Sequence, residues 1–131
     1  MKIEFFLPMI PPTPTAQEKG VSVIRGKPHF YEKPEIKAIR EMFKTKLRAY
    51  APGIPFDGAV RLVTKWCYPI TGKRKDGEWK TTAPDTDGAI KLFKDAMADV
   101  GFFTNDSRVA SEITEKFWAA VPGIYVSVEE L

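Results

Sequence analysis

The hydrophobic residues of this 131-residue chain follow two different periods in successive segments, and this change of period most limits the fold. Spacings of three and four predict two helices with one buried stripe each, at Pro34–Tyr50 and Asp87–Val100. Alternating or continuous apolar residues predict four strands, at Lys2–Leu7, Ala59–Tyr68, Val109–Trp118 and Ile124–Glu129.

The order of these elements predicts an α+β, or mixed α/β, fold with two main helices packed on a small mixed sheet. The proline-rich segment Pro8–Gly20 is expected to be a loop, and Val21–Arg25 with Pro28–Tyr31 to form a hairpin. The length leaves room for a single domain over residues 1–131.

Charge is unevenly distributed along the chain. Residues 1–82 contain 16 Lys and Arg against 8 Asp and Glu, a net charge of +8, whereas residues 83–131 contain 4 against 9, a net charge of −5. Such a division suits a protein that holds a polyanion on one surface and a divalent cation on another, or it reflects solvated faces with no common role.

Two features indicate a cytoplasmic protein. Cys67 is the only cysteine, so no disulfide can form within the chain. The apolar run at the N-terminus is short and is broken by Pro8 and Pro11, so we expect neither a signal peptide nor a membrane span.

Three aspartates are the strongest candidates for chemistry. Asp85 and Asp87 lie two residues apart in the lead-in to the second predicted helix, and Asp106 follows that helix. Two carboxylates 4 Å apart repel by roughly 4 kcal/mol at an effective dielectric of 20, which a hard cation such as Mg²⁺ or Mn²⁺ offsets. The alternative is that Asp85 and Asp87 only cap the helix.

Basic residues flank these acids. Lys91 lies one helical turn after Asp87, where it can stabilise charge on a phosphate oxygen or form a simple ion pair. The preceding loop interleaves cations with an aromatic residue, as DNA-backbone contacts and base stacking require, although a solvated loop is the alternative. Its candidate DNA-binding residues are Lys73, Arg74, Lys75, Trp79 and Lys80.

The pattern of these residues resembles the RusA family of Holliday junction resolvases, particularly members from phages and prophages. The resemblance rests on Asp85-x-Asp87-x-x-x-Lys91, Asp95-Ala96, Gly101-Phe102 and Asn105-Asp106. Two positions depart from the family pattern, because Gly88 stands where Asn is common and Asn105 where an acid is common.

The resemblance implies a homodimeric, Mg²⁺-dependent endonuclease that binds four-way DNA and nicks two opposing strands symmetrically in recombination and repair. It implies metal-binding roles for Asp85, Asp87 and Asp106, and a catalytic role for Lys91. Two alternatives stay open: a nuclease for branched or flap DNA in general, and a junction-binding protein with weak turnover.

Overall fold

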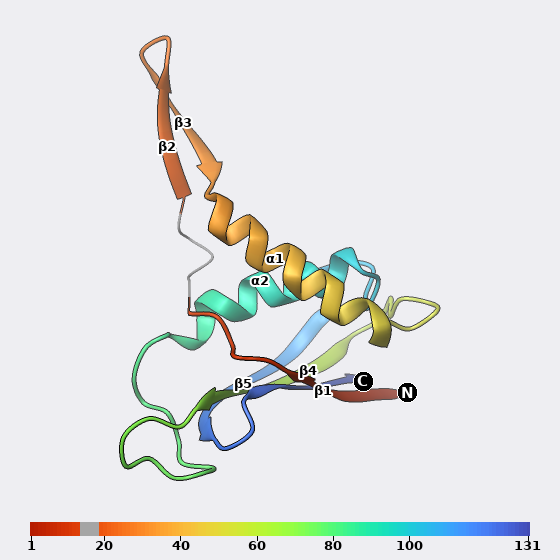
Figure 1. Cartoon of the computed structure of the whole chain (residues 1–131). Coiled ribbons are helices and arrows are strands. Elements are labelled where there is room, and N and C mark those ends of the chain that lie inside the picture. The colour runs from red at the N-terminus through yellow and green to blue at the C-terminus, as the bar shows by residue number, and fades with distance from the viewer. Residues whose placement is uncertain (14–18) are drawn as a thin grey trace.

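The computed structural model describes residues 1–13 and 19–131, which form a four-stranded mixed sheet, a two-stranded hairpin and two main helices (Figure 1). This confirms the predicted α+β class. Residues 14–18 of the predicted loop Pro8–Gly20 lie outside the described residues. The strands are β1 Lys2–Pro8, β2 Lys19–Ile24, β3 Lys27–Glu32, β4 Val60–Pro69, β5 Val109–Ala119 and β6 Gly123–Glu130. The helices are α1 Pro34–Leu47 and α2 Thr86–Asp99, with 3₁₀ turns at Arg48–Tyr50 and Asp106–Arg108.

The order of strands in the larger sheet determines where the two ends of α2 lie. The order is β1-β6-β4-β5, in which β4 and β5 run parallel while the other neighbours run antiparallel. Parallel neighbours need a crossover connection, and α2 supplies it between β4 and β5. The start of α2 therefore lies toward the end of β5, and the end of α2 toward its beginning.

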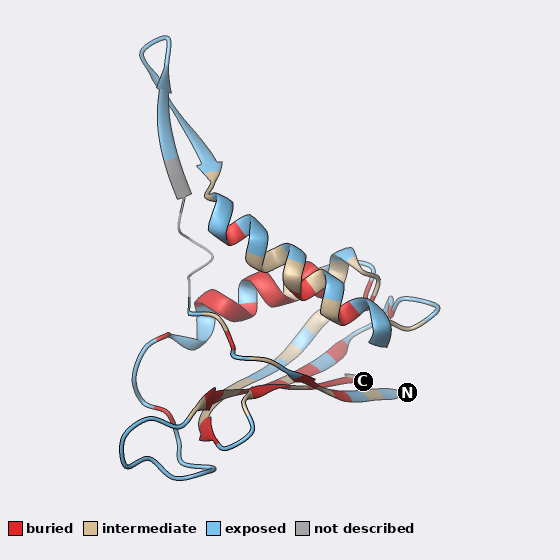
Figure 2. Cartoon of the chain, viewed as in Figure 1, coloured by how far each residue is buried: buried red, intermediate tan, exposed pale blue. Residues whose placement is uncertain are grey.

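Both helices cover the same face of the sheet and bury the core against it (Figures 1 and 2). Alternate residues of β4, including Trp66, point into this core, which confirms the alternation expected from the sequence. Phe93 of α2 meets Phe43 of α1 and Trp66 edge-on, with ring centroids 5.0 and 5.5 Å away. The predicted stripe of α1 fails at Tyr50, because the α-helix ends at Leu47; the tyrosine ring stacks on Phe5 of β1, with centroids 4.4 Å apart, and stays exposed.

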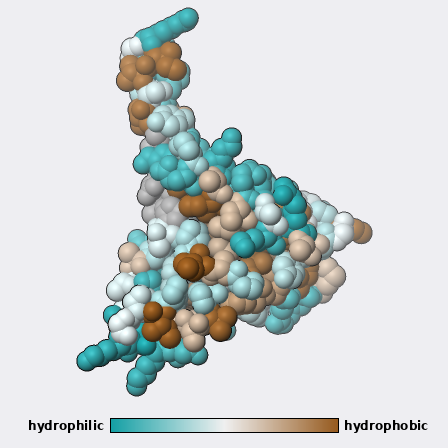
Figure 3. Space-filling model, in the orientation of Figure 1, coloured by the Kyte–Doolittle hydropathy of each residue, from teal (hydrophilic) through white to brown (hydrophobic). Residues whose placement is uncertain are grey.

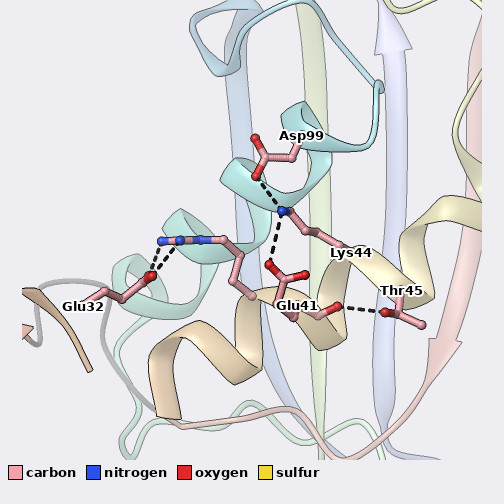
Figure 4. A network of polar contacts seen from close by, with 6 residues as sticks. Glu32, Glu41, Lys44, Thr45 and Asp99 are labelled. Carbon is pink, nitrogen blue, oxygen red and sulfur yellow. Dashed lines mark hydrogen bonds and ion pairs between the residues drawn. The ribbon is translucent and has the colours of Figure 1, made fainter. Parts of the chain in front are cut away.

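Ion pairs connect α1 to its neighbours. Lys44 lies 3.4 Å from both Glu41 of its own helix and Asp99 at the end of α2 (Figure 4). Arg40 pairs with Glu32, the last residue of β3. These contacts connect α1 both to α2 and to the base of the hairpin.

The predicted hairpin is confirmed and projects from the body of the molecule (Figure 1). Its turn lies at Arg25 and Gly26, which both have positive φ angles, one residue earlier than expected. Apolar side chains on it are exposed, including Val23 and Phe30 (Figure 3). No helix in the described part of the chain is long and apolar enough to cross a membrane.

Candidate functional site

A polar groove runs between α2 and β5. Its volume is about 490 Å³. The α2 side contributes Asp87, Lys91 and Lys94, and the opposite wall contains Asp106 together with Glu112 and Thr114 of β5, while Thr86 and Ile90 complete the lining. Three carboxylates and two ammonium groups therefore face one hollow, which brings Asp87, Lys91 and Asp106 of the predicted site to the same surface.

The helix start presents the first two predicted aspartates to solvent. Asp85 is the residue before α2 and has an extended backbone, but its side chain makes no capping hydrogen bond. Both Asp85 and Asp87 are exposed. Asp85 thus occupies the cap position that the alternative interpretation predicted, while its carboxylate remains available to a ligand. Asp85 is not among the residues that line the groove.

Asp106 is carried to the groove by a sharp reversal after α2. Gly101 has a φ of 95°, and Phe102 donates from its N–H to the carbonyl of Met97 over 3.0 Å, which closes the helix in a Schellman-type turn. The next residues then pair with Phe56, which donates to the Phe102 carbonyl over 2.9 Å. This return places Asp106 in the wall of the groove, although it follows the end of the helix in the sequence.

Within the described residues of one chain, the three predicted ligands do not form a preformed metal site. Asp106 contacts Asp95, and the two carboxyls also line a second hollow beside the last turns of α2. Asp95 lies about 12 Å along the helix axis from Asp87, at 1.5 Å per residue. Among the described residues, no group of three or more His, Cys, Asp or Glu side chains is arranged to hold a metal ion. The structure thus shows no preformed trio within a single chain, and the assignment of Asp85, Asp87 and Asp106 as metal ligands stays a prediction.

The carboxyl group of Asp95 belongs to the surroundings of Asp106. Burial is the main reason that the pKa of Asp95 is raised, and a hydrogen bond with Asp106 raises it further. The positive charges of Lys91 and Arg40 oppose this rise. Lys91 thus stands one turn after Asp87 and one turn before Asp95, and its charge acts on Asp95.

Sequence reasoning missed the wall that β5 supplies. Glu112 and Thr114 point to the helix-covered face, and Glu112 pairs with Lys94 over 3.2 Å. The signal was present in the sequence, because polar residues alternate through Glu112, Thr114 and Lys116 on a strand face that must look toward the helices. Only the pairing of β5 with β4 shows which helix this face meets.

The predicted DNA-binding loop divides into two parts with different exposure. Lys73, Arg74 and Lys75 are all exposed, and the Arg74 guanidinium lies 3.4 Å from Glu78. Trp79 is 58% exposed and packs on Phe117, which lies on the sheet face that no helix covers. The aromatic side chain is therefore on the other side of β5 from the groove.

Lys80 differs from the prediction. Its side chain is only 8% exposed, and its ammonium group lies 4.0 Å from the centre of the Trp118 ring. It donates to the hydroxyl of Thr82 over 2.6 Å, and its burial lowers the pKa of the amine. In this structure Lys80 supports the loop from inside and is not presented at the surface.

The two departures from the family pattern have defined surroundings. The side-chain oxygen of Asn105 accepts a hydrogen bond from the N–H of Ser107 over 2.8 Å and so caps the 3₁₀ turn that begins with Asp106. An aspartate would accept the same bond. Gly88 is buried in the first turn of α2.

Comparison with known proteins agrees with these motifs. A family model described as "Endodeoxyribonuclease RusA" matches residues 9–129, a range that includes the whole groove. The chain is also similar to a crossover junction endodeoxyribonuclease rusA from Lactococcus phage r1t. The two are 29% identical over 111 residues, which cover 83% of each chain.

Proposed function

We propose a function from the premise that the chain belongs to the RusA family of endodeoxyribonucleases, whose family model matches residues 9–129. In this proposal the protein resolves four-way DNA junctions by Mg²⁺-dependent cleavage with paired, symmetric nicks. The groove between α2 and β5 is the proposed site of cleavage. The observation that carries this proposal is that Asp87, Lys91 and Asp106 line one open groove together with Glu112.

The chemistry of the groove suits a hard divalent cation. Its carboxylate and hydroxyl oxygens are the ligand atoms that Mg²⁺ prefers, with Mn²⁺ as a substitute. Mg²⁺ is usually held by one or two carboxylates together with substrate phosphate, so a preformed cage of three is not required. We propose Asp85, Asp87 and Asp106 as its ligands; when bound, the cation lowers the pKa of water and withdraws charge from the scissile phosphate.

Lys91 is proposed to act on the phosphate itself. Its exposed side chain lines the groove together with Asp87 and Asp106. An ammonium group held there attracts the DNA backbone and stabilises negative charge that develops on a phosphate oxygen during hydrolysis. Among the described residues, Lys91 forms no ion pair within 4 Å, so its charge is not paired with a carboxylate there.

A homodimer fits both the substrate and the separation of the acids. A four-way junction has approximate two-fold symmetry, so two copies of one site can nick opposing strands. Because no group of three carboxylates among the described residues of one chain is arranged to hold a metal ion, three carboxylates around one ion would need residues from two copies. We therefore propose that the second copy completes the acidic site.

The catalytic assignment is tested with Asp87→Asn and Asp106→Asn, and with Glu35→Gln on the exposed first turn of α1 as the matched control. Each aspartate variant should lower the cleavage rate of a synthetic junction by at least about 10²-fold, while the control cleaves normally. Junction binding without metal should be retained. An aspartate variant that nicks at the rate of the unmodified protein would falsify the assignment.

The shared site is tested by mixing the two inactive variants. In a mixed dimer, a site built from Asp87 of one copy and Asp106 of the other leaves one centre intact, so the mixture should nick one strand of the junction. If both acids serve the same copy, every centre in the mixed dimer carries a substitution and the mixture stays inactive.

The choice of substrate is tested by comparing four-way, flap and plain duplex DNA, each with Mg²⁺, with Mn²⁺ and with a chelator. Cleavage of four-way DNA alone, dependent on added metal, is the expected result. Equal cleavage of flaps would favour a general branched-DNA nuclease, and binding without cleavage would favour a junction-binding protein.

A further inference from the structure

One lysine of β5 holds the backbone that leads into the candidate site. The ammonium group of Lys116 donates hydrogen bonds to the carbonyl oxygens of Thr82, over 2.8 Å, and of Pro84, over 2.6 Å. Pro84 immediately precedes Asp85. Lys116 thus binds the first and the last of the three carbonyl groups that precede the first predicted aspartate, and a charged donor makes such bonds strong.

The same stretch of chain is already fastened to β5 by its backbone. Trp118 accepts from the N–H of Gly77 and donates to the carbonyl of Glu78, both over 2.8 Å. The N–H of Lys80 then donates to the carbonyl of Lys116 over 3.0 Å. Residues 77–80 therefore run along the edge of β5, and the Lys116 side chain continues the attachment where the backbone pairing stops.

The strand that carries Lys116 also forms a wall of the groove. Glu112, Thr114 and Lys116 occupy alternate positions on its helix-covered face, opposite Leu62, Thr64 and Trp66 of β4. The beginning of this strand follows directly from the turn that contains Asp106. The strand β5 is therefore connected both to the segment that precedes Asp85 and to the turn that contains Asp106.

We propose that Lys116 is a positioning residue that fixes the Asp85–Asp87 end of the groove relative to β5 and hence to Asp106. This inference rests on the proposed function. Two carbonyl oxygens occupy the ammonium group, so it acts on the protein backbone and does not serve as a contact to DNA. Without these two hydrogen bonds, the segment that leads into α2 is no longer held against β5, while the pairing of residues 77–80 with β5 is kept.

The test compares Lys116→Met with Lys116→Arg, whose guanidinium can still donate to two carbonyls. Lys65→Met is the control, because Lys65 is an exposed lysine on the opposite face of the neighbouring strand. Hydrogen exchange followed by mass spectrometry should show amides in residues 89–92, the first that α2 protects by helical hydrogen bonds, exchanging about tenfold faster in Lys116→Met, because the freed lead-in lets the helix start fray. The rest of the chain, Lys116→Arg and Lys65→Met should match the unmodified protein.

Junction cleavage gives the second measurement. Lys116→Met should lower kcat by about 10²-fold, because small displacements of catalytic groups have effects of that size. KM and metal-free junction binding should stay within about twofold, and Lys116→Arg should recover most of kcat.

Three results would overturn the proposal: unchanged exchange in residues 89–92, an unchanged kcat for Lys116→Met, or a loss confined to KM and metal-free binding, which would make Lys116 a DNA contact. Failure of the proposed function is distinguishable. In that case the unmodified protein would not cleave junctions, or Asp87→Asn would cleave normally, while the exchange comparison would still decide whether Lys116 holds the segment.

Discussion

Neutralising the exposed lysines of the loop between β4 and α2 should flatten the salt dependence of junction binding by a predictable amount. Each phosphate contact made by a cation contributes about 0.9 to the slope of log K against log salt on duplex DNA. Lys73 and Lys75 are exposed, and no ion pair within 4 Å engages either of them among the described residues. Changing both to Gln should therefore reduce the slope by about 1.8.

The structure also separates the neighbouring cations from this pair. Arg74 is already partnered by Glu78 over 3.4 Å, so Arg74→Gln should add at most about 0.9 to the change in slope. Lys80 is buried over Trp118, so Lys80→Met should leave the slope unchanged and lower the melting temperature instead.

The assay is fluorescence anisotropy of a labelled four-way junction without divalent metal, over a series of salt concentrations. Between about 50 and 200 mM salt, the unmodified protein should lose about tenfold more affinity than the Lys73 and Lys75 double variant. A double variant with Lys2 and Lys65 changed to Gln, on the uncovered sheet face, serves as the control. A slope equal to that of the unmodified protein would refute DNA contact by the loop.

Two further changes test the fold that supports the groove. Gly101→Ala places a side chain at φ 95° and should lower the free energy of unfolding by about 1–2 kcal/mol, or the Tm by about 4–8 °C. Gly53→Ala is the control, because Gly53 has neither a positive φ nor a close neighbour, and it should melt as the unmodified protein does. Burial raises the pKa of Tyr68 to about 12, while an unfolded tyrosine ionises near pH 10. The contribution of un-ionised Tyr68 to the free energy of unfolding is therefore complete below pH 10 and is lost as the pH rises toward 12. In urea unfolding at pH 8 and 11, Tyr68→Phe should lose about 1.4 kcal/mol less stability than the unmodified protein; equal losses would contradict the assignment.

The secondary structure was largely predictable because each element carries its own period. The alternation in β4 and the stripe of α2 depend on residues that are close in sequence, and both were placed within two residues of their observed bounds. The neighbours of each strand were not predictable. A period of two shows that one face is buried, but it does not show that β6 lies between β1 and β4 or that β5 runs parallel to β4.

The candidate site shows the same division. The sequence alone placed Asp85, Asp87 and Lys91 on the approach and first turns of a helix, because their spacing and the helical period are local properties. The position of Asp106 depends on the Gly101 turn and on pairing with Phe56, which lies far away in the sequence. This return of the chain places Asp106 beside Asp95 and in the same groove as Asp87.

Composition identified a basic loop, but only tertiary contacts distinguish its lysines. Lys73 and Lys80 have the same side chain and lie seven residues apart, yet one is exposed and the other is covered by Trp118. Residue types and local spacing thus determined which helices and strands form and which side chains can carry charge. The tertiary structure decided which of those charges face a common groove, because that depends on β5 returning beside β4 after the α2 crossover.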